Sequence, residues 1–275
     1  MKKERFGLIG YPIAHSLSPA LFKAGYHGRF PYELIETADF EEAYSRFLHV
    51  YDGINVTAPF KEQAFAKADL VSEECRLIRA TNLLVKTPDG VKAYNSDYLG
   101  VRKWLEETIG AGSGKDKSVL IAGCGGAGKA AAIAAASLGM KVVLMNRNTA
   151  KAEAMAESIA GMENAPAAEV QPLSSFRGYF RRCDIVIYNI PTSIPALYEL
   201  TEDDFRGMPG RSVKHVLEAN YKDPSFGSGL LLKAKEANPD FSYTEGKVWL
   251  LYQALTGYEI FTSEKPDFAS MSVVL

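Results

Sequence analysis

A lysine closely follows a short apolar segment that is typical of a buried strand. Residues 53–57 read GINVT, and Pro59 ends that strand two residues before Lys61. An ammonium group at the mouth of a strand is held in one place, and a fixed ammonium can donate a proton to a reacting atom. The alternative is a solvated residue that opens the next helix, because lysine is rarely buried.

A pair of serines suits a small carboxylate. Ser16 and Ser18 stand in GYPIAHSLSP, where the first expected strand gives way to a helix. Two hydroxyls beside free helix N–H groups can hold a carboxylate. The alternative for Ser18 is a helix N-cap ahead of Pro19.

Four more polar residues stand at the ends of expected elements. Asn55 and Thr57 share one face of the GINVT strand, because they are two residues apart. Asn82 begins one arm of a hairpin expected over residues 80–97, and Asp97 follows the other arm. A turn residue and a helix N-cap are the alternatives for Asn82 and Asp97.

A glycine-rich turn opens the second half of the chain. Gly123, Gly125 and Gly128 fit GxGxxG between an apolar strand and a helix, the context in which this pattern indicates a dinucleotide site. These glycines permit the turn, the approach of a pyrophosphate and close helix packing. The same letters begin a triphosphate-binding GxxxxGK loop, but Ala130 stands where that loop needs Ser or Thr for Mg²⁺. A purely structural turn is a further alternative. The expected cofactor-binding residues of the turn are Gly123, Gly125, Gly126, Ala127 and Gly128.

The end of the next strand indicates which dinucleotide binds. An NAD-specific turn places Asp or Glu there, whereas this chain has Asn146 followed by Arg147. A guanidinium can clamp a 2′-phosphate, and Lys151 adds charge one helical turn later. The sequence therefore predicts NADP as the cofactor. The alternative is an Arg147 side chain that only faces solvent.

The elements that must position these residues alternate between strands and helices throughout. After the glycine turn the order is strand, helix, strand, helix, which predicts a parallel sheet. Residues 110–117, GAGSGKDK, are the expected linker. The predicted fold class is α/β with two domains, the second a Rossmann-type doubly wound sheet, and with a C-terminal helix that returns to the first domain. The expected boundaries are 1–103 for the substrate domain, 104–240 for the cofactor domain and 241–275 for the returning segment.

The composition is that of a globular protein and excludes several function classes. Of 275 residues, 47% are hydrophobic and 23% charged, and the net charge of -2 gives no electrostatic footprint for nucleic acid or an anionic membrane. The three cysteines and four histidines are dispersed, so we expect no metal site. The apolar runs are too short for a signal peptide or a membrane helix, so we expect a cytoplasmic protein. We expect it to be a monomer or a homodimer.

The chain resembles the shikimate dehydrogenase family over nearly its whole length. The blocks that carry the resemblance, in the family's order, are GYPIAHSLSP, GINVTAPFKEQAF, ATNLLV, YNSDYLGV, AGCGGAGKA, NRN and GKVWLLYQA. The HSxSP and NVTxPFK blocks are specific, whereas the glycine turn is not. The resemblance implies NADP-dependent reduction of 3-dehydroshikimate to shikimate, a step of aromatic amino-acid biosynthesis.

The resemblance also implies roles for individual residues. Lys61 and Asp97 would be the catalytic pair, because hydride delivery leaves negative charge on the ketone oxygen and a lysine held by a carboxylate can neutralise it. The residues expected to bind substrate are Ser16 and Ser18 for the carboxylate, Thr57, Asn82 and Gln253 for the hydroxyls, and Tyr221 nearby. The chain departs from the family pattern at Tyr188–Thr192, at Glu218 and Asn220, at Gly246–Trp249, and at Phe22 and Lys23.

Three alternative functions stay open at this point. A relative inside the enzyme class would oxidise quinate or another hydroxylated cyclic acid. A sensor would bind the dinucleotide without turnover, although a sensor has no need of the proton donor Lys61. A triphosphate-dependent enzyme would use the glycine turn with Mg²⁺.

Overall fold

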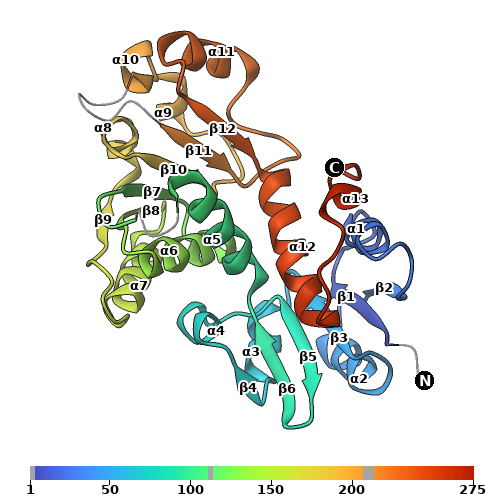
Figure 1. Cartoon of the computed structure of the whole chain (residues 1–275). Helices are drawn as coiled ribbons and strands as arrows, with labels where there is room; N and C mark the ends of the chain where they lie inside the picture. The colour runs from blue at the N-terminus through green and yellow to red at the C-terminus, as the bar shows by residue number, and fades with distance from the viewer. Residues whose placement is uncertain (1–3, 111–113, 207–213) are drawn as a thin grey trace. The chain divides into compact units, whose positions relative to one another are not determined.

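The computed structural model describes residues 4–110, 114–206 and 214–275, which form two compact units (Figure 1). The first unit comprises the chain up to Gly100 together with Leu250–Leu275, and the second comprises Val101–Trp249. Both divisions fall inside helices, α5 (Ser96–Ile109) and α12 (Gly246–Thr262). The expected linker at 110–117 lies partly outside the described residues.

The first unit is built on a mixed sheet. Its strand order is β2-β1-β3-β5-β6-β4, with β1, β2 and β3 parallel and β5 antiparallel to both β3 and β6. The expected hairpin at residues 80–97 is confirmed as β5 and β6. The strands are β1 (Phe6–Gly10), β2 (Tyr32–Glu36), β3 (Gly53–Val56), β4 (Leu70–Val71), β5 (Leu83–Thr87) and β6 (Gly90–Tyr94).

Helices cover both faces of this sheet, and each face has its own core. On one face Ile54 and Val56 pack with Phe47 and Phe60, whereas on the other Phe6 and Phe22 pack with residues of α12 and α13. Residues 70 and 71 pair with β6 as β4, and the helix that follows them begins at Glu73. Besides α5 and α12, the helices are α1 (Ser18–Gly25), α2 (Phe40–Val50), α3 (Lys61–Ala66), α4 (Glu73–Ile78) and α13 (Phe268–Ser272).

The second unit is a parallel six-stranded sheet, which confirms the predicted Rossmann-type fold. The order β12-β11-β10-β7-β8-β9 places β7 between β8 and β10, so the strand order reverses beside β7. Ligands of such sheets bind at the carboxyl ends of the strands at this reversal. The strands are β7 (Ser118–Ala122), β8 (Lys141–Met145), β9 (Glu169–Gln171), β10 (Ile185–Tyr188), β11 (His215–Glu218) and β12 (Ser242–Glu245).

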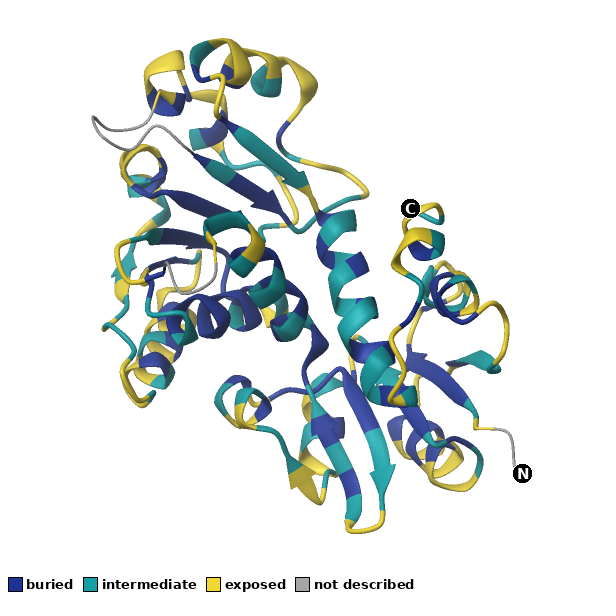
Figure 2. Ribbon diagram, in the orientation of Figure 1, coloured by how far each residue is buried: buried dark blue, intermediate teal, exposed yellow. Residues whose placement is uncertain are grey.

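The sequence pattern did not indicate β9 or β12, because neither is an apolar run: both are edge strands that are half-buried or exposed. By contrast, the central strands are almost wholly buried, and so is most of α6 (Figure 2). The helices are α6 (Gly126–Ser137), α7 (Thr149–Ala160), α8 (Phe176–Arg182), α9 (Pro195–Tyr198), α10 (Glu202–Phe205) and α11 (Ser228–Ala237), with a 3-10 turn at Leu173–Ser175.

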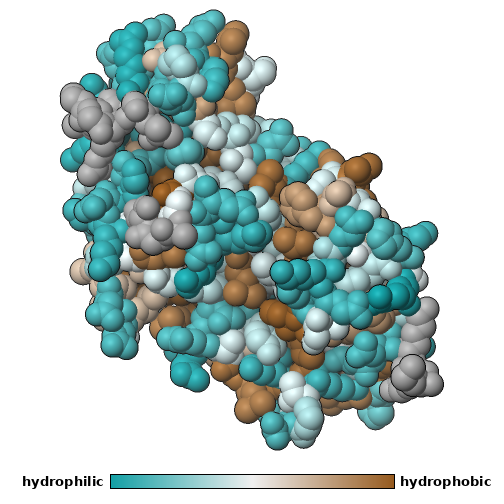
Figure 3. All heavy atoms as spheres, in the orientation of Figure 1, coloured by the Kyte–Doolittle hydropathy of each residue, from teal (hydrophilic) through white to brown (hydrophobic). Residues whose placement is uncertain are grey.

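The surface is mixed in character. The face drawn in Figure 3 is mostly hydrophilic with smaller hydrophobic areas, and the exposed large apolar side chains include Tyr198, Leu232 and Val273. Among the described residues, every helix is too short or too polar to cross a membrane.

Candidate active site

Lys61 and Asp97 lie in direct contact in the first unit. The Lys61 Nζ atom is 2.5 Å from Asp97 Oδ2, and the two side chains are 29% and 14% exposed. Lys61 is the first residue of α3, directly after Phe60, whose ring is buried against Phe40. The buried ring fixes the start of the helix, so that the half-buried ammonium is held against the carboxylate and still reaches solvent.

Asp97 is available for this pair because another residue caps α5. The Asn95 side chain accepts a hydrogen bond from the Tyr98 N–H at 3.0 Å and donates one to the Ala80 carbonyl at 3.1 Å. The cap interpretation of Asp97 is therefore wrong, and Asn95 takes that role. Sequence reasoning missed Asn95, although Asn is among the best N-cap residues and stands one position before the helix.

Asn82 is clamped to the residue beside Asp97. It is buried, its Oδ1 atom accepts the Ser96 N–H at 2.7 Å, and its Nδ2 atom donates to Ser96 Oγ at 3.0 Å. Asn82 is therefore a buried clamp between the start of β5 and the start of α5, rather than a solvated turn residue. This reciprocal pair fixes the distance between Asn82 and the Lys61–Asp97 ion pair.

The serine hydroxyls lie against each other at the start of α1. Ser16 Oγ donates to Ser18 Oγ at 3.1 Å and accepts the Ser18 N–H at 3.2 Å. Leu17 occupies the N-cap position and no side chain caps the helix, so the alternative interpretation of Ser18 as the cap is wrong. Both hydroxyls are half-buried and adjacent, which suits two-point contact with a small anion.

Close backbone approaches place Thr57 and Gln253. A Cβ on Gly10 would lie 2.4 Å from Thr57 Cγ2, and one on Gly100 would lie 2.6 Å from the Gln253 backbone N. Real Cβ atoms are not found so near other atoms, so both positions require glycine. Gly100 thus lets α12 pass close to α5 and brings Gln253 to the helix that carries Asp97.

Tyr221 belongs to the second unit and follows β11, where it is half-buried. The departure from the family pattern at Glu218 has a structural role there. The buried Glu218 carboxylate accepts the N–H groups of Ser225 and Phe226 and the Tyr243 hydroxyl, at 2.5, 3.2 and 2.8 Å. Glu218 therefore fixes the turn that follows Tyr221.

The glycine turn connects β7 to α6 and is exposed at Gly125 and Gly126. Gly123 has a φ of +97°, a value that side chains rarely allow, and a Cβ on Gly128 would lie 1.8 Å from the Gly123 carbonyl oxygen. Cβ atoms on Gly125 and Gly126 would meet nothing within 4 Å. The close approach of Gly128 to Gly123 explains why the turn is tight. The open space at the N-terminus of the 12-residue helix α6 can hold a phosphate group.

Asn146 ties the next strand end to this turn. Its Oδ1 atom accepts the Cys124 N–H at 3.0 Å, and its Nδ2 atom donates to the Asn148 carbonyl at 2.8 Å. The side chains of Arg147 and Lys151 are exposed, and neither forms an ion pair or a hydrogen bond with another described residue. Two cations without an internal partner at this strand end fit a dinucleotide that carries a 2′-phosphate.

The described residues hold no cluster of three or more His, Cys, Asp or Glu side chains that could bind a metal ion. The three cysteines, Cys75, Cys124 and Cys183, are free and buried. Burial raises the pKa of Cys75 to about 12 and those of Cys124 and Cys183 to about 11, so these thiols stay protonated and are poor nucleophiles.

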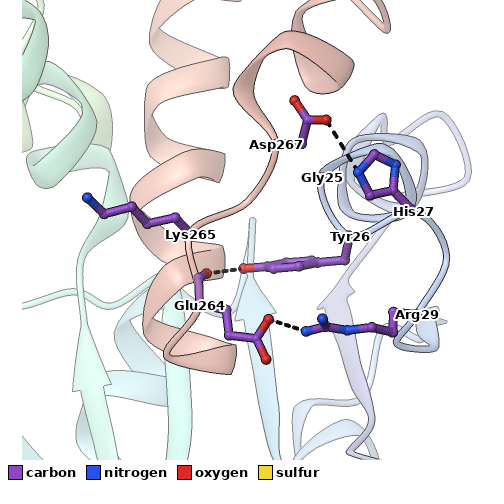
Figure 4. A pocket seen from close by; sticks show the side chains of 7 residues that line it. All are labelled: Gly25, Tyr26, His27, Arg29, Glu264, Lys265 and Asp267. Atoms are coloured by element: carbon purple, nitrogen blue, oxygen red, sulfur yellow. Dashed lines mark hydrogen bonds and ion pairs between the residues drawn. The ribbon is translucent and has the colours of Figure 1, made fainter.

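A shallow hollow of about 350 Å³ lies elsewhere in the first unit (Figure 4). Several of its polar side chains pair with one another, because Arg29 forms an ion pair with Glu264 and the His27 Nε2 atom is 3.3 Å from Asp267 Oδ2. None of the residues predicted to bind substrate lines it. Its other lining residues are Gly25, Tyr26 and Lys265.

Comparison with known proteins gives consistent matches along the chain. A family model described as the shikimate dehydrogenase substrate binding domain matches residues 8–84, and one described as shikimate / quinate 5-dehydrogenase matches residues 106–203.

Individual relatives match over almost their full length. The shikimate dehydrogenase (NADP(+)) of Caldicellulosiruptor saccharolyticus is 31% identical, covering 94% of this chain and 91% of the relative. That of Methanocaldococcus jannaschii is 30% identical, covering 98% and 95%. The Thermus thermophilus shikimate 5-dehydrogenase, crystallised with NADP(H) and shikimate, superposes with a TM-score of 0.77 at 25% identity and covers 98% of both chains. The chain therefore belongs to the shikimate dehydrogenase family.

Proposed function

We propose that this protein catalyses the reversible, NADP-dependent reduction of 3-dehydroshikimate to shikimate. Its curated relatives are named shikimate dehydrogenase (NADP(+)). The protein is therefore an oxidoreductase that acts on a CH–OH group, and NADP is its cofactor. The observation that carries the proposal is the 2.5 Å contact between Lys61 and Asp97, because a half-buried ammonium held by a carboxylate can donate the proton that carbonyl reduction requires.

Lys61 acts at the oxygen of the reacting carbon. The nicotinamide supplies the hydride when NADPH is bound. As negative charge develops on the ketone oxygen, the Lys61 ammonium stabilises it and transfers one proton to it, which completes the alcohol. In the reverse direction the neutral amine of Lys61 accepts the hydroxyl proton. Asp97 holds Lys61 in place in both directions.

Neighbouring residues would orient the substrate around this pair. Ser16 and Ser18 offer two adjacent hydroxyls for the carboxylate, and Asn82 is fixed next to the ion pair by its clamp on Ser96. Thr57, Gln253 and Tyr221 are the remaining proposed substrate residues. Such orientation raises the reaction rate, because the translational and rotational entropy of the substrate is already lost on binding.

The residues of the second unit would hold NADP. A helix N-terminus offers N–H groups without an intrahelical partner, and at the start of α6 a Cβ on Gly125 or Gly126 would meet nothing within 4 Å, which leaves room for the pyrophosphate. Arg147 and Lys151 would bind the 2′-phosphate, and Asn146 holds their strand end against the glycine turn. The remaining proposed contacts come from the backbone of Gly123, Ala127 and Gly128.

A four-way kinetic comparison tests the proposal. Shikimate and quinate are each oxidised with NADP⁺ and with NAD⁺, and reduced nicotinamide is followed by absorbance. We expect the highest kcat/KM for shikimate with NADP⁺. Higher kcat/KM with quinate would favour the related dehydrogenase. Binding of NADP⁺ without turnover of either acid would favour the sensor, and Mg²⁺-dependent binding of a nucleoside triphosphate would favour the third alternative. A cytoplasmic location and a monomeric or homodimeric state stay predictions.

A further inference from the structure

A phenol connects two strands beneath the proposed substrate residues. The Tyr32 hydroxyl, at the start of β2, donates to Asn55 Oδ1 at 2.7 Å. Asn55 Nδ2 in turn donates to the carbonyl of Asn82 at a longer 3.4 Å. Asn55 shares the sheet face of Gly53, which packs against the Phe261 ring, so this chain of polar groups runs through a largely aromatic core. Burial of a polar group in such a core lowers the stability of the fold unless the group is hydrogen bonded.

A second phenol reaches the serine pair from the C-terminal helix. Tyr258 is 2% exposed, and its hydroxyl donates to the main-chain carbonyl of Ser18 at 3.1 Å. Tyr258 stands on α12 five residues after Gln253. The same helix therefore contacts both the start of α1 and the residues around Asp97.

The two phenols lie next to each other and to the Ser18 side chain. The ring centroids of Tyr32 and Tyr258 are 6.0 Å apart in an edge-on arrangement. Burial raises the pKa of both phenols well above the ordinary value, and a hydrogen bond with the Ser18 side chain lowers each pKa in part. Because the hydrogens of both phenols go to carbonyl-type oxygens, each phenol oxygen keeps a lone pair, and the single hydrogen of the Ser18 hydroxyl can go to one of them at a time.

We propose, on the basis of the proposed function, that Tyr32 and Tyr258 are positioning residues that align the two ends of the substrate site. Tyr258 fixes Ser18 at the carboxylate end. Tyr32 fixes the main chain of Asn82 at the hydroxyl end through Asn55. Neutral hydroxyl and amide donors bind an anion well only when they are already aligned, because each is weaker than a cation and loses more by reorienting.

The test compares two substitutions that remove one oxygen and keep the ring. Tyr32→Phe and Tyr258→Phe are measured beside the wild type by calorimetric titration with shikimate and by steady-state oxidation with NADP⁺. We expect each change to raise the Kd and KM for shikimate about 2- to 10-fold, the range for one lost hydrogen bond. The kcat should stay within about 2-fold, because neither phenol touches the Lys61–Asp97 pair. In the double variant the fold-increase in Kd should be smaller than the product of the two single fold-increases, because the effects of connected groups on binding free energy are not additive.

Tyr26→Phe is the matched control. This phenol belongs to the same aromatic core, but it bonds to the main-chain carbonyls of Tyr258 and Glu264 and to the Thr262 hydroxyl (Figure 4 shows the Glu264 contact). It contacts none of the proposed substrate residues. We expect it to lower Tm as much as the other two substitutions while leaving Kd and KM unchanged.

Shikimate methyl ester separates the two ends of the site. With this neutral ligand the effect of Tyr258→Phe should fall below about 2-fold, because the carboxylate is gone, whereas the effect of Tyr32→Phe should persist. Wild-type affinity in both variants, or equal losses in Tyr26→Phe, would overturn the inference while the proposed function stands. A wild type that neither binds nor oxidises shikimate would overturn both.

Discussion

The proposed chemistry in the first unit depends on side chains that satisfy each other, whereas the proposed cofactor site in the second depends on groups with no partner. Lys61 closes an ion pair with Asp97, and Asn82 closes a reciprocal pair with Ser96. At the glycine turn, by contrast, the positions of Gly125 and Gly126 face open space.

The difference reflects what each region must do. A proton donor has to keep one geometry through the reaction, so its neighbours fix it before substrate arrives. A phosphate site has to keep its donors free, because an internal anion would compete with the ligand. The side chains of Arg147 and Lys151 lack an internal partner among the described residues. Their lack of a partner supports the proposed phosphate site as the Lys61–Asp97 ion pair supports the proposed proton donor.

Removal of the fixed amine should have the largest effect. Lys61→Ala deletes the proposed acid and base, so we expect kcat to fall by about 10² to 10⁴ with little change in NADP⁺ affinity. Steady-state oxidation of shikimate and a fluorescence titration with NADPH measure the two quantities. Lys67→Ala is the matched control, because Lys67 also pairs with a carboxylate, that of Glu41 at 2.9 Å, on the protein surface. A kcat that is unchanged in Lys61→Ala would remove the acid–base role.

Removal of the unpaired guanidinium should come next. Arg147→Ala should raise the Kd for NADP⁺ about 10- to 100-fold, the usual value of charge-assisted hydrogen bonds, and should change the Kd for NAD⁺ little. Calorimetry with both cofactors gives the ratio. Arg181, another exposed arginine of the second unit, provides the control variant Arg181→Ala. Equal losses for the two cofactors would contradict recognition of the 2′-phosphate.

Alanine substitutions at the glycine turn distinguish glycines that leave room for the cofactor from glycines that are needed for packing. Gly126→Ala should leave Tm unchanged, since its Cβ meets nothing within 4 Å, yet it should weaken NADP⁺ several-fold by taking room from the pyrophosphate. Gly229→Ala is the control, because its Cβ is equally free at the start of α11. In Gly128→Ala the added Cβ would collide with the Gly123 carbonyl, so we expect a lower Tm as well. Unchanged NADP⁺ affinity in Gly126→Ala would place the pyrophosphate elsewhere.

The buried Lys214 in the second unit should have the smallest effect, and one that depends on pH. Its ammonium donates to the carbonyls of Phe180 and Cys183. Burial lowers the pKa of Lys214 to about 8, against the charges of Cys183, Asp184 and Asp204, which raise it. Between about pH 8 and pH 10.5 the unfolded chain binds this proton and the folded chain does not, so stability rises with pH.

Lys214→Met removes that dependence while keeping a similar volume. Between pH 8 and pH 9.5 the free energy of unfolding of the wild type should rise relative to the variant, by at most about 1.4 kcal/mol per pH unit. Urea denaturation at several pH values measures the difference. A constant difference across this range would show that Lys214 keeps its ordinary pKa in the fold.

Much of the fold followed from local patterns in the sequence. Continuous apolar runs identified the central strands of the second sheet. Asp39, whose residue type favours helix N-caps, caps α2 by accepting the N–H groups of Glu41 and Glu42. The edge strands β9 and β12 were missed, because edge strands need no apolar run. Leu70 and Val71 form strand β4 ahead of α4, because pairing with β6 decides their conformation.

The chemical types at the site were likewise fixed by the sequence. The lysine behind a strand, the serine pair, the glycine spacing and the arginine in place of a carboxylate are all local features, and local features can be read along one chain. The family resemblance then joined Lys61 to Asp97, which are 36 residues apart.

Only the tertiary structure decided which polar side chains pair with another part of the protein and which do not. It placed the cap of α5 on Asn95 and so left Asp97 to Lys61, and it assigned Glu218 to a turn. It also brought Tyr258 from the far end of the chain to Ser18, a separation of 240 residues. Hydrogen bonds between distant segments depend on how helices pack, and no spacing along the sequence specifies that packing.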